Sequence, residues 1–152
     1  MNRETAIKIP LNELSESEFH ESTEEFTGNY VISKSRLRAS RTNIWGIITS
    51  KELIHGNEAI ELTDFTGKIK CLVPDEKSNL LDGIGLWESV QIIGKIRQKN
   101  ELFILAESVK KLSFGEELLK RADNIYSLRN LKEYKKEKKD EEEIIIERRN
   151  IQ

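Results

Sequence analysis

The chain has 152 residues, which suits one domain with an appended arm or tail and is too short for a multidomain enzyme. Its 25 Lys and Arg against 27 Asp and Glu give a formal net charge of -2, so any affinity for phosphate must come from a local patch. No apolar run approaches the ~20 residues that span a bilayer, and the first ten residues lack the apolar core of a signal peptide. The single cysteine, Cys71, excludes an internal disulfide and fits a reducing compartment. We therefore expect a cytoplasmic protein with no membrane contact, in which Cys71 is a small buried residue.

Residues 1–41 are polar and have their apolar residues in small groups. This pattern predicts an N-terminal arm that packs against a domain and is not a domain of its own. The sequence "NYVIS", residues 29–33, predicts one short strand within the arm.

Residues 42–112 have the composition of strands separated by turns. "TNIWGIITSKEL" is an apolar run in which Gly46 indicates a bend or bulge, and the turns "HGNE" and "DFTGK" predict a meander with two further strands. "PDEKSNLLDGIG" predicts a short helix, and "WESVQIIGKIRQ" and "ELFILAESVKKL" predict two more strands with "KN" in the turn between them. Three strands, a short helix and two strands within about 70 residues are the layout of an OB-fold, an all-β five-stranded barrel with Greek-key topology.

Residues 113–135 predict a C-terminal α-helix, and residues 136–152 a charged, solvated tail. Winding the helix at about 100° per residue gathers its apolar side chains on one broad half, wide enough to meet more than one neighbour. We expect this half to bind partner subunits, although a helix that folds back onto its own barrel fits the pattern too. The predicted partner-binding residues are Phe114, Leu118, Leu119, Ala122, Ile125 and Tyr126.

Lysines alternate with apolar residues in "KIKCLV", residues 68–73. Alternation on the third barrel strand turns Ile69, Cys71 and Val73 inward and leaves the residues between them outward. The fourth strand, "SVQIIGKIRQK", has a similar division with Val90, Ile92 and Ile96 inward. Because the outward face of the second and third strands binds oligonucleotides in OB-folds, these outward residues are predicted to contact nucleic acid, although solvated surface residues fit the pattern too. The outward set is Lys68, Lys70, Leu72, Lys95 and Arg97.

Two aromatic residues are candidates for stacking on bases, which single-strand grooves require. Phe65 lies at a turn tip and is the better candidate, since Trp45 lies among isoleucines of the first strand, where a Trp is more often a packed core residue.

The residues that catalysis requires do not converge in the sequence. His20 and His55 have no partner at metal-ligand spacing, and there is neither a glycine-rich phosphate loop nor a serine at a nucleophile elbow. We expect a binding protein and not an enzyme, with no metal and no cofactor.

The segments "TNIWGIITSKEL", "AIELTDFTGKIKCLV" and "WESVQIIGKIRQKNELFILAESVKKL" resemble the OB domain of the middle subunit of replication protein A, and more closely its archaeal relatives. "NELSES" and "NYVIS" are similar to the arm of those relatives, and a charged fraction of 34% is typical of proteins from hot-living organisms. The resemblance implies a heterotrimeric single-stranded DNA-binding protein of DNA replication and repair. It implies further that the helix after the barrel packs with the other OB-fold subunits. The sequence departs from the family at Leu72, where the eukaryotic subunit has a Trp, and at Gln98, where it has another aromatic residue.

Two other interpretations remain open at this point. The "DFTGK" turn also resembles the anticodon-binding domains of aminoacyl-tRNA synthetases, which would make the chain an RNA-binding or tRNA-binding OB module. Alternatively, the chain is a pure scaffold subunit whose groove is filled by a partner peptide or by its own acidic arm.

Overall fold

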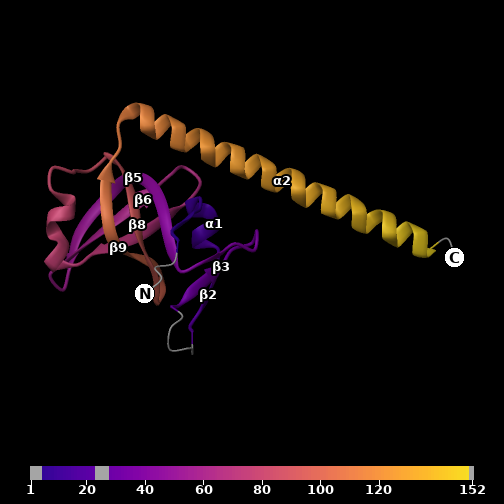
Figure 1. Ribbon diagram of the computed structural model, residues 1–152, viewed down its shortest axis with the longest axis horizontal. Helices are drawn as coiled ribbons and strands as arrows, with labels where there is room; N and C mark the ends of the chain where they lie inside the picture. The colour runs from indigo at the N-terminus through magenta and orange to yellow at the C-terminus, as the bar shows by residue number, and fades with distance from the viewer. Residues whose placement is uncertain (1–4, 23–27, 151–152) are drawn as a thin grey trace. The chain divides into compact units, whose positions relative to one another are not determined.

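The computed structural model describes the backbone of residues 5–22 and 28–150, and the side chains of residues 5–22, 28–126 and 139–146. The chain divides into two compact units, residues 1–117 and residues 118–152. The first unit contains all the strands described below (Figure 1).

The main sheet of the first unit follows the predicted order of three strands, a short helix and two strands. Its first three strands form an antiparallel meander, and its last two an antiparallel hairpin. In chain order the elements are β5 (Arg41–Ile54), β6 (Asn57–Thr63), β7 (Lys68–Val73), the 3-10 helix η1 (Asp75–Leu81), β8 (Ser89–Lys99) and β9 (Glu101–Lys111). The three hairpin turns lie where "HGNE", "DFTGK" and "KN" predict them.

The sheet closes on itself because β5 pairs with two strands. The strand order is β1-β5-β6-β7-β9-β8, and β8 pairs in addition with the first half of β5. The expected number of strands was five, but this sheet has six, since the short strand β1 (Ile7–Lys8) from the arm lies parallel to Thr42–Asn43. An edge pairing of two residues is set by backbone hydrogen bonds and leaves little pattern in the sequence.

Alternate residues of the strands fill the core as the sequence predicts. Ile69, Cys71 and Val73 on β7 are buried, as are Val90, Ile92 and Ile96 on β8. The pairing of β8 with β9 shifts register between Ile93 and Gly94. A Cβ on Gly94 would lie 2.4 Å from the carbonyl oxygen of Leu105, so this glycine is where the bent strands approach most closely.

The arm contributes directly to the barrel core. Helix α1 (Leu11–Ser15) buries Leu11 and Leu14 completely, and the Leu11 amide donates to the Asp64 carboxylate at 3.0 Å. The same carboxylate accepts from the amides of Thr66 and Gly67, so it organises its own turn and holds α1 against it.

A second, three-stranded sheet completes the arm: β2 (Glu18–His20), β3 (Tyr30–Ile32) and β4 (Arg38–Ala39). The strand predicted at "NYVIS" is β3 and is confirmed. The arm has three strands more than the sequence predicted, because strands of two or three residues carry no readable alternation.

Helix α2 (Phe114–Asn150) begins at a capping box. The Ser113 amide donates to the Glu116 carboxylate at 3.2 Å, and the Glu116 amide donates to the Ser113 hydroxyl at the same distance. The helix runs through the charged segment that was expected to be a tail from residue 136 on. That segment consists mostly of Lys, Glu and Arg, which are good helix formers, and has neither Gly nor Pro, which explains its helical backbone. Within the described residues, no helix is both long and apolar enough to cross a membrane.

Candidate nucleic-acid interface

A groove of about 330 Å³ lies over β7, between the β5–β6 turn and the β8–β9 turn. Its lining combines an apolar floor with two lysines and one histidine. The residues are Ile54, His55, Asn57, Ala59, Lys70, Cys71, Leu72, Lys99, Glu101 and Phe103.

The strand register brings the outward residues of three strands together. Because β9 lies parallel to β7, Phe103 is the partner of Lys70, and across the β8–β9 hairpin Phe103 is opposite Arg97. The next pair on the same face is Leu105 with Leu72, and Leu105 is opposite Lys95 on β8. The face therefore carries rows of cationic and apolar side chains, as a surface that contacts phosphates and base planes requires.

The two turns that bound the groove have tight, left-handed backbone conformations. His55 and Gly56 have φ values of 50° and 82°, the geometry of a two-residue hairpin turn, and Asn100 has a φ of 68°. Asn and Gly tolerate this region at little energetic cost. The His55 and Lys99 side chains are thereby placed at the two sides of the groove.

An ion pair crosses one end of the groove. Lys70 Nζ lies 3.2 Å from Glu101 Oε1, and both side chains are partly exposed. The hydrogen bond and the charge of Glu101 raise the pKa of Lys70 above its ordinary value. Lys70 is therefore a cation that is already paired with the Glu101 carboxylate. A phosphate that binds Lys70 would have to displace this carboxylate.

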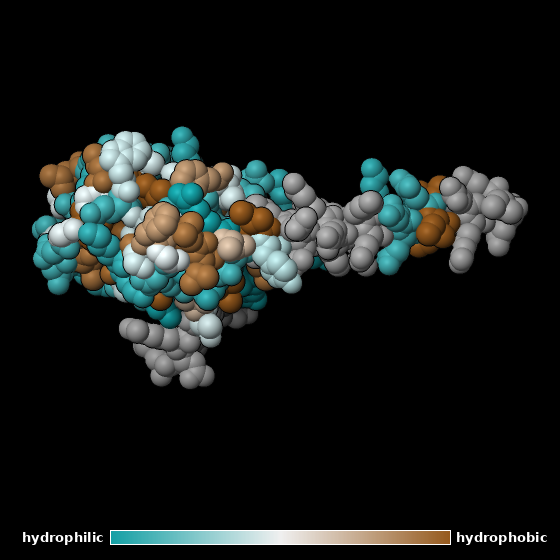
Figure 2. All heavy atoms as spheres, turned by 90° about the horizontal axis from the view of Figure 1, so that it is seen from above, coloured by the Kyte–Doolittle hydropathy of each residue, from teal (hydrophilic) through white to brown (hydrophobic). Residues whose placement is uncertain are grey.

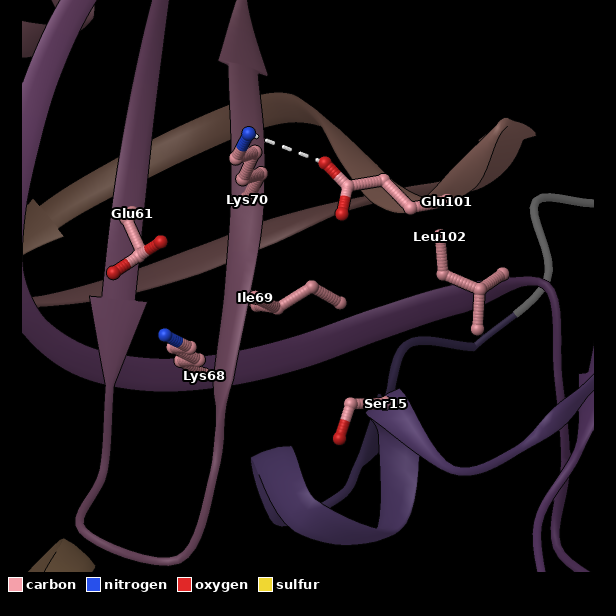
Figure 3. Close-up of a pocket in the computed structure, with 7 residues that line it drawn as sticks. All are labelled: Ser15, Glu61, Lys68, Ile69, Lys70, Glu101 and Leu102. Carbon is pink, nitrogen blue, oxygen red and sulfur yellow. Dashed lines mark ion pairs between the residues drawn. The ribbon is translucent and has the colours of Figure 1, made fainter.

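A second, smaller pocket of about 200 Å³ adjoins the groove (Figure 3). Lys70 and Glu101 line both, and Figure 3 shows their ion pair above Lys68, with Ser15 at the end of α1 below. Lys68 is exposed there, as the alternation predicts. The second pocket thus continues the groove toward the arm, with the two lysines accompanied by the carboxylates of Glu61 and Glu101.

The two aromatic candidates lie outside the lining of the groove. Trp45 is only 6% exposed, so neither face of its indole is open to a base in this structure. Phe65 is 64% exposed at the β6–β7 turn, with a φ of 70°, at the end of β7 opposite the groove. Among the candidates from the sequence, the groove contains Lys70 and Leu72. Lys95 and Arg97 lie on neighbouring positions of the same face.

The sequence did not predict that Phe103, Lys99 and His55 line the groove. Phe103 alternates with the buried residue Ile104, which marks it as outward-facing. What the sequence does not show is that β9 lies parallel to β7, which places this ring beside Lys70. His55, in the β5–β6 turn, is exposed and lines the groove.

No group of three or more potential metal ligands occurs in the part of the chain that the structure describes.

The thiol of Cys71 is buried, and burial raises its pKa far above the ordinary value, so it stays protonated. His20 is not simply exposed, since its ring stacks on Tyr30 with centroids 5.2 Å apart.

The predicted partner-binding side chains of α2 are exposed. Phe114, Leu119, Ile125 and Tyr126 are between 66% and 76% exposed, and Leu118 is 48% exposed. A further apolar group, Ile144 to Ile146, is at least half exposed near the end of the helix, where Figure 2 shows it between two grey segments.

Comparisons by sequence find neither a matching protein family nor a matching curated protein. Comparison of structures finds a chain of the Stn1-ten1 complex from S. pombe, with 15% identity, a TM-score of 0.66, and coverage of 84% of this chain and 96% of the other. A chain of a replication protein A heterotrimer bound to ssDNA matches with 13% identity, a TM-score of 0.60, and coverage of 81% and 96%. At such low identity the likeness concerns the backbone. The first unit of the chain is an OB-fold followed by the start of a C-terminal helix.

Proposed function

We propose that this chain is a non-enzymatic subunit of a replication protein A-like complex and that it binds single-stranded DNA in the groove over β7. In this proposal β5 to β9 are the five strands of the Greek-key barrel, and β1 is an addition from the arm. The complex is a heterotrimer of the archaeal type, works in DNA replication and repair in the cytoplasm, and holds this chain as its middle subunit.

The observation that carries the proposal is the position of Lys70, Leu72 and Phe103 on adjacent strands of one face, between two projecting turns. OB-folds bind oligonucleotides on this face and between these loops. A lysine provides the phosphate contact, and a phenylalanine ring provides a sequence-tolerant stacking surface.

The structural likeness supports the proposal in a second way. One of the similar structures is a heterotrimer bound to ssDNA, and the other is a complex of two different proteins. Both likenesses extend over four fifths or more of this chain, which is more than the barrel alone.

Assembly through α2 is the second part of the proposal. An exposed apolar side chain gains about 1.5–3 kcal/mol when it is fully buried, so a helix with several of them is stabilised by partners. The predicted partners are the other OB-fold subunits of the complex, which would cover Leu118, Leu119, Ile125 and Tyr126.

The proposal is tested by fluorescence anisotropy with fluorescein-labelled oligo-dT, a duplex of the same length and tRNA. Tightest binding to oligo-dT is expected, because only an unpaired strand offers open base faces to Phe103. Preference for tRNA would favour an RNA-binding module. Absence of binding to all three, combined with copurification of partner proteins from the source organism, would favour a pure scaffold.

A further inference from the structure

The small β2-β3-β4 sheet presents a second cationic and aromatic surface, which the groove does not include. Its inner face is buried through Val31 and Ala39. Its outer face carries His20 stacked on Tyr30, and the Arg38 guanidinium lies 4.0 Å from the centre of the Tyr30 ring on the neighbouring strand. This stack fixes the guanidinium over an aromatic surface.

The segment from the β3–β4 turn to the first residue of β5 is strongly basic. Residues 33–41, "SKSRLRASR", contain four cations and no acid. Two of them are occupied by ion pairs, Lys34 with Glu16 at 2.9 Å and Arg41 with Glu107 at 3.1 Å. Arg36 and Arg38 are exposed, and neither has an acidic partner among the residues that the structure describes.

The turn has a defined conformation that holds these cations outward. The Arg36 amide donates to the Ser33 carbonyl at 2.9 Å, and the Leu37 amide donates to the Ser33 hydroxyl at 3.0 Å. The Ser35 hydroxyl donates to the Glu13 carboxylate of α1. These bonds place Arg36 at a φ of 65° and tie the turn to the helix.

The basic turn adjoins the pocket beside the groove. Ser15, at the end of α1, lines that pocket together with Lys68 and Lys70 (Figure 3). The next residue, Glu16, forms the ion pair with Lys34 of the turn. A continuous set of residues therefore leads from the groove, through Lys70 and Lys68 and past the end of α1, to Lys34, which lies in the same turn as Arg36.

We propose that the β3–β4 turn and the His20–Tyr30–Arg38 stack extend the path of single-stranded nucleic acid beyond the groove, with Arg36 and Arg38 binding backbone phosphates. This inference rests on the proposed function, because it assumes that the strand occupies the groove. Acidic residues also lie along this path: Glu61 and Glu101 line the pocket, and Glu16 and Glu13 of the arm contact Lys34 and Ser35 of the turn. The extension predicts that the chain binds long oligonucleotides with more phosphate contacts than its barrel alone provides.

The test compares labelled oligo-dT of about 6 and about 16 nucleotides, a short and a long length within the range of OB-fold site sizes. The variant is Arg36→Gln with Arg38→Gln. The control, Lys77→Gln with Lys139→Gln, removes the same charge from exposed residues elsewhere. With the long oligonucleotide, the magnitude of the negative slope of log K against log salt should decrease by about 1.4, since each single-strand phosphate contact contributes about 0.7. The short oligonucleotide should bind the variant and the wild type equally, and the control should match the wild type with both lengths.

Several results would overturn the extension. An unchanged slope with the long oligonucleotide would show that the turn does not reach the strand. An equal loss with both lengths would place the two arginines inside the groove's own footprint. Unchanged DNA binding with loss of a copurifying protein would assign the turn to a protein partner. If the wild type binds no oligonucleotide, the extension and the proposed function both fail.

Thermal unfolding of each variant controls for folding. If the double variant unfolds at a lower temperature, Arg36→Gln alone, in the solvent-exposed turn, replaces it.

Discussion

Lys70 on β7 and Glu101 at the start of β9 form an ion pair, with 3.2 Å between Nζ and Oε1, where the groove meets the second pocket. The carboxylate holds the ammonium group in place on the face that is proposed to bind phosphates. Because the carboxylate is negatively charged, it also competes with phosphate for the Lys70 ammonium group. Because the pair is partly exposed, salt screens it, and its contribution to stability is small.

Glu101→Gln should strengthen binding of oligo-dT at low salt, by roughly two- to fivefold, because it frees Lys70 and removes a charge that repels phosphate. Loss of the carboxylate also returns the pKa of Lys70 toward 10.5. A raised lysine pKa stabilises the fold below the unfolded-state pKa and loses its effect as pH rises through the folded-state value, so the change in folding stability should disappear only in strongly alkaline solution. Glu76→Gln, at an exposed position of η1, is the charge-matched control. Weaker binding by the Glu101 variant would show that the carboxylate supports the site.

Phe103→Ala should weaken binding of oligo-dT by about 1–3 kcal/mol if the ring stacks on a base. The groove contains Phe103 but not Phe65, so Phe65→Ala is the matched comparison at an exposed aromatic residue. The anisotropy titrations should show the larger loss for Phe103. If Phe65→Ala has the larger effect, the strand passes over the β6–β7 turn instead.

Asp64→Ala should lower the free energy of unfolding by about 1–3 kcal/mol, since the substitution leaves buried donors without a partner. Asp64 is 3% exposed and accepts from the amides of Leu11, Thr66 and Gly67. Urea denaturation provides the measurement, with Asp82→Ala in an exposed turn as control. Equal stability of the two variants would mean that the turn and α1 are held by packing alone.

Leu118→Ala with Ile125→Ala should abolish copurification of the partner subunits and leave thermal unfolding of the isolated chain nearly unaltered. Exposed side chains contribute little to the stability of their own chain but much to an interface. The two residues are 48% and 66% exposed. Glu142→Ala, on the polar part of the same helix, should have neither effect. A large drop in the unfolding temperature with intact assembly would assign the residues to intramolecular packing.

The OB-fold could be predicted from the sequence because its signals are local. Alternation placed Ile69, Cys71 and Val73 inside, and the turn sequences fixed the order of strands and of η1. The arm was harder to predict. Its strands have two or three residues, and Leu11 and Leu14 are buried in a core formed mostly by residues far along the chain, where the Leu11 amide donates to Asp64.

The candidate site could be predicted only in part, because alternation along one strand is a local signal, whereas the pairing of distant strands is not. Lys70 and Leu72 could be recognised from the alternation on one strand. Phe103 joins them only through the parallel pairing of β7 with β9, which are 28 residues or more apart in the chain, from Val73 to Glu101. The Lys70–Glu101 pair depends on the same contact. At Trp45 the surrounding isoleucines favoured a packed core residue over a base platform, and the burial of Trp45 leaves neither face of its indole open.

The salt dependence of oligo-dT binding tests the central claim most directly, because phosphate contacts release counterions in proportion to their number. The variants are Lys68→Glu with Lys70→Glu, and Lys95→Glu with Arg97→Glu. The plot of log K against log salt has a negative slope. If these side chains contact phosphates, each double variant should reduce the magnitude of this slope by about 1.4, at about 0.7 for each contact. An unchanged slope in both double variants, with the fold intact by thermal unfolding, would contradict single-strand binding on this face of the barrel.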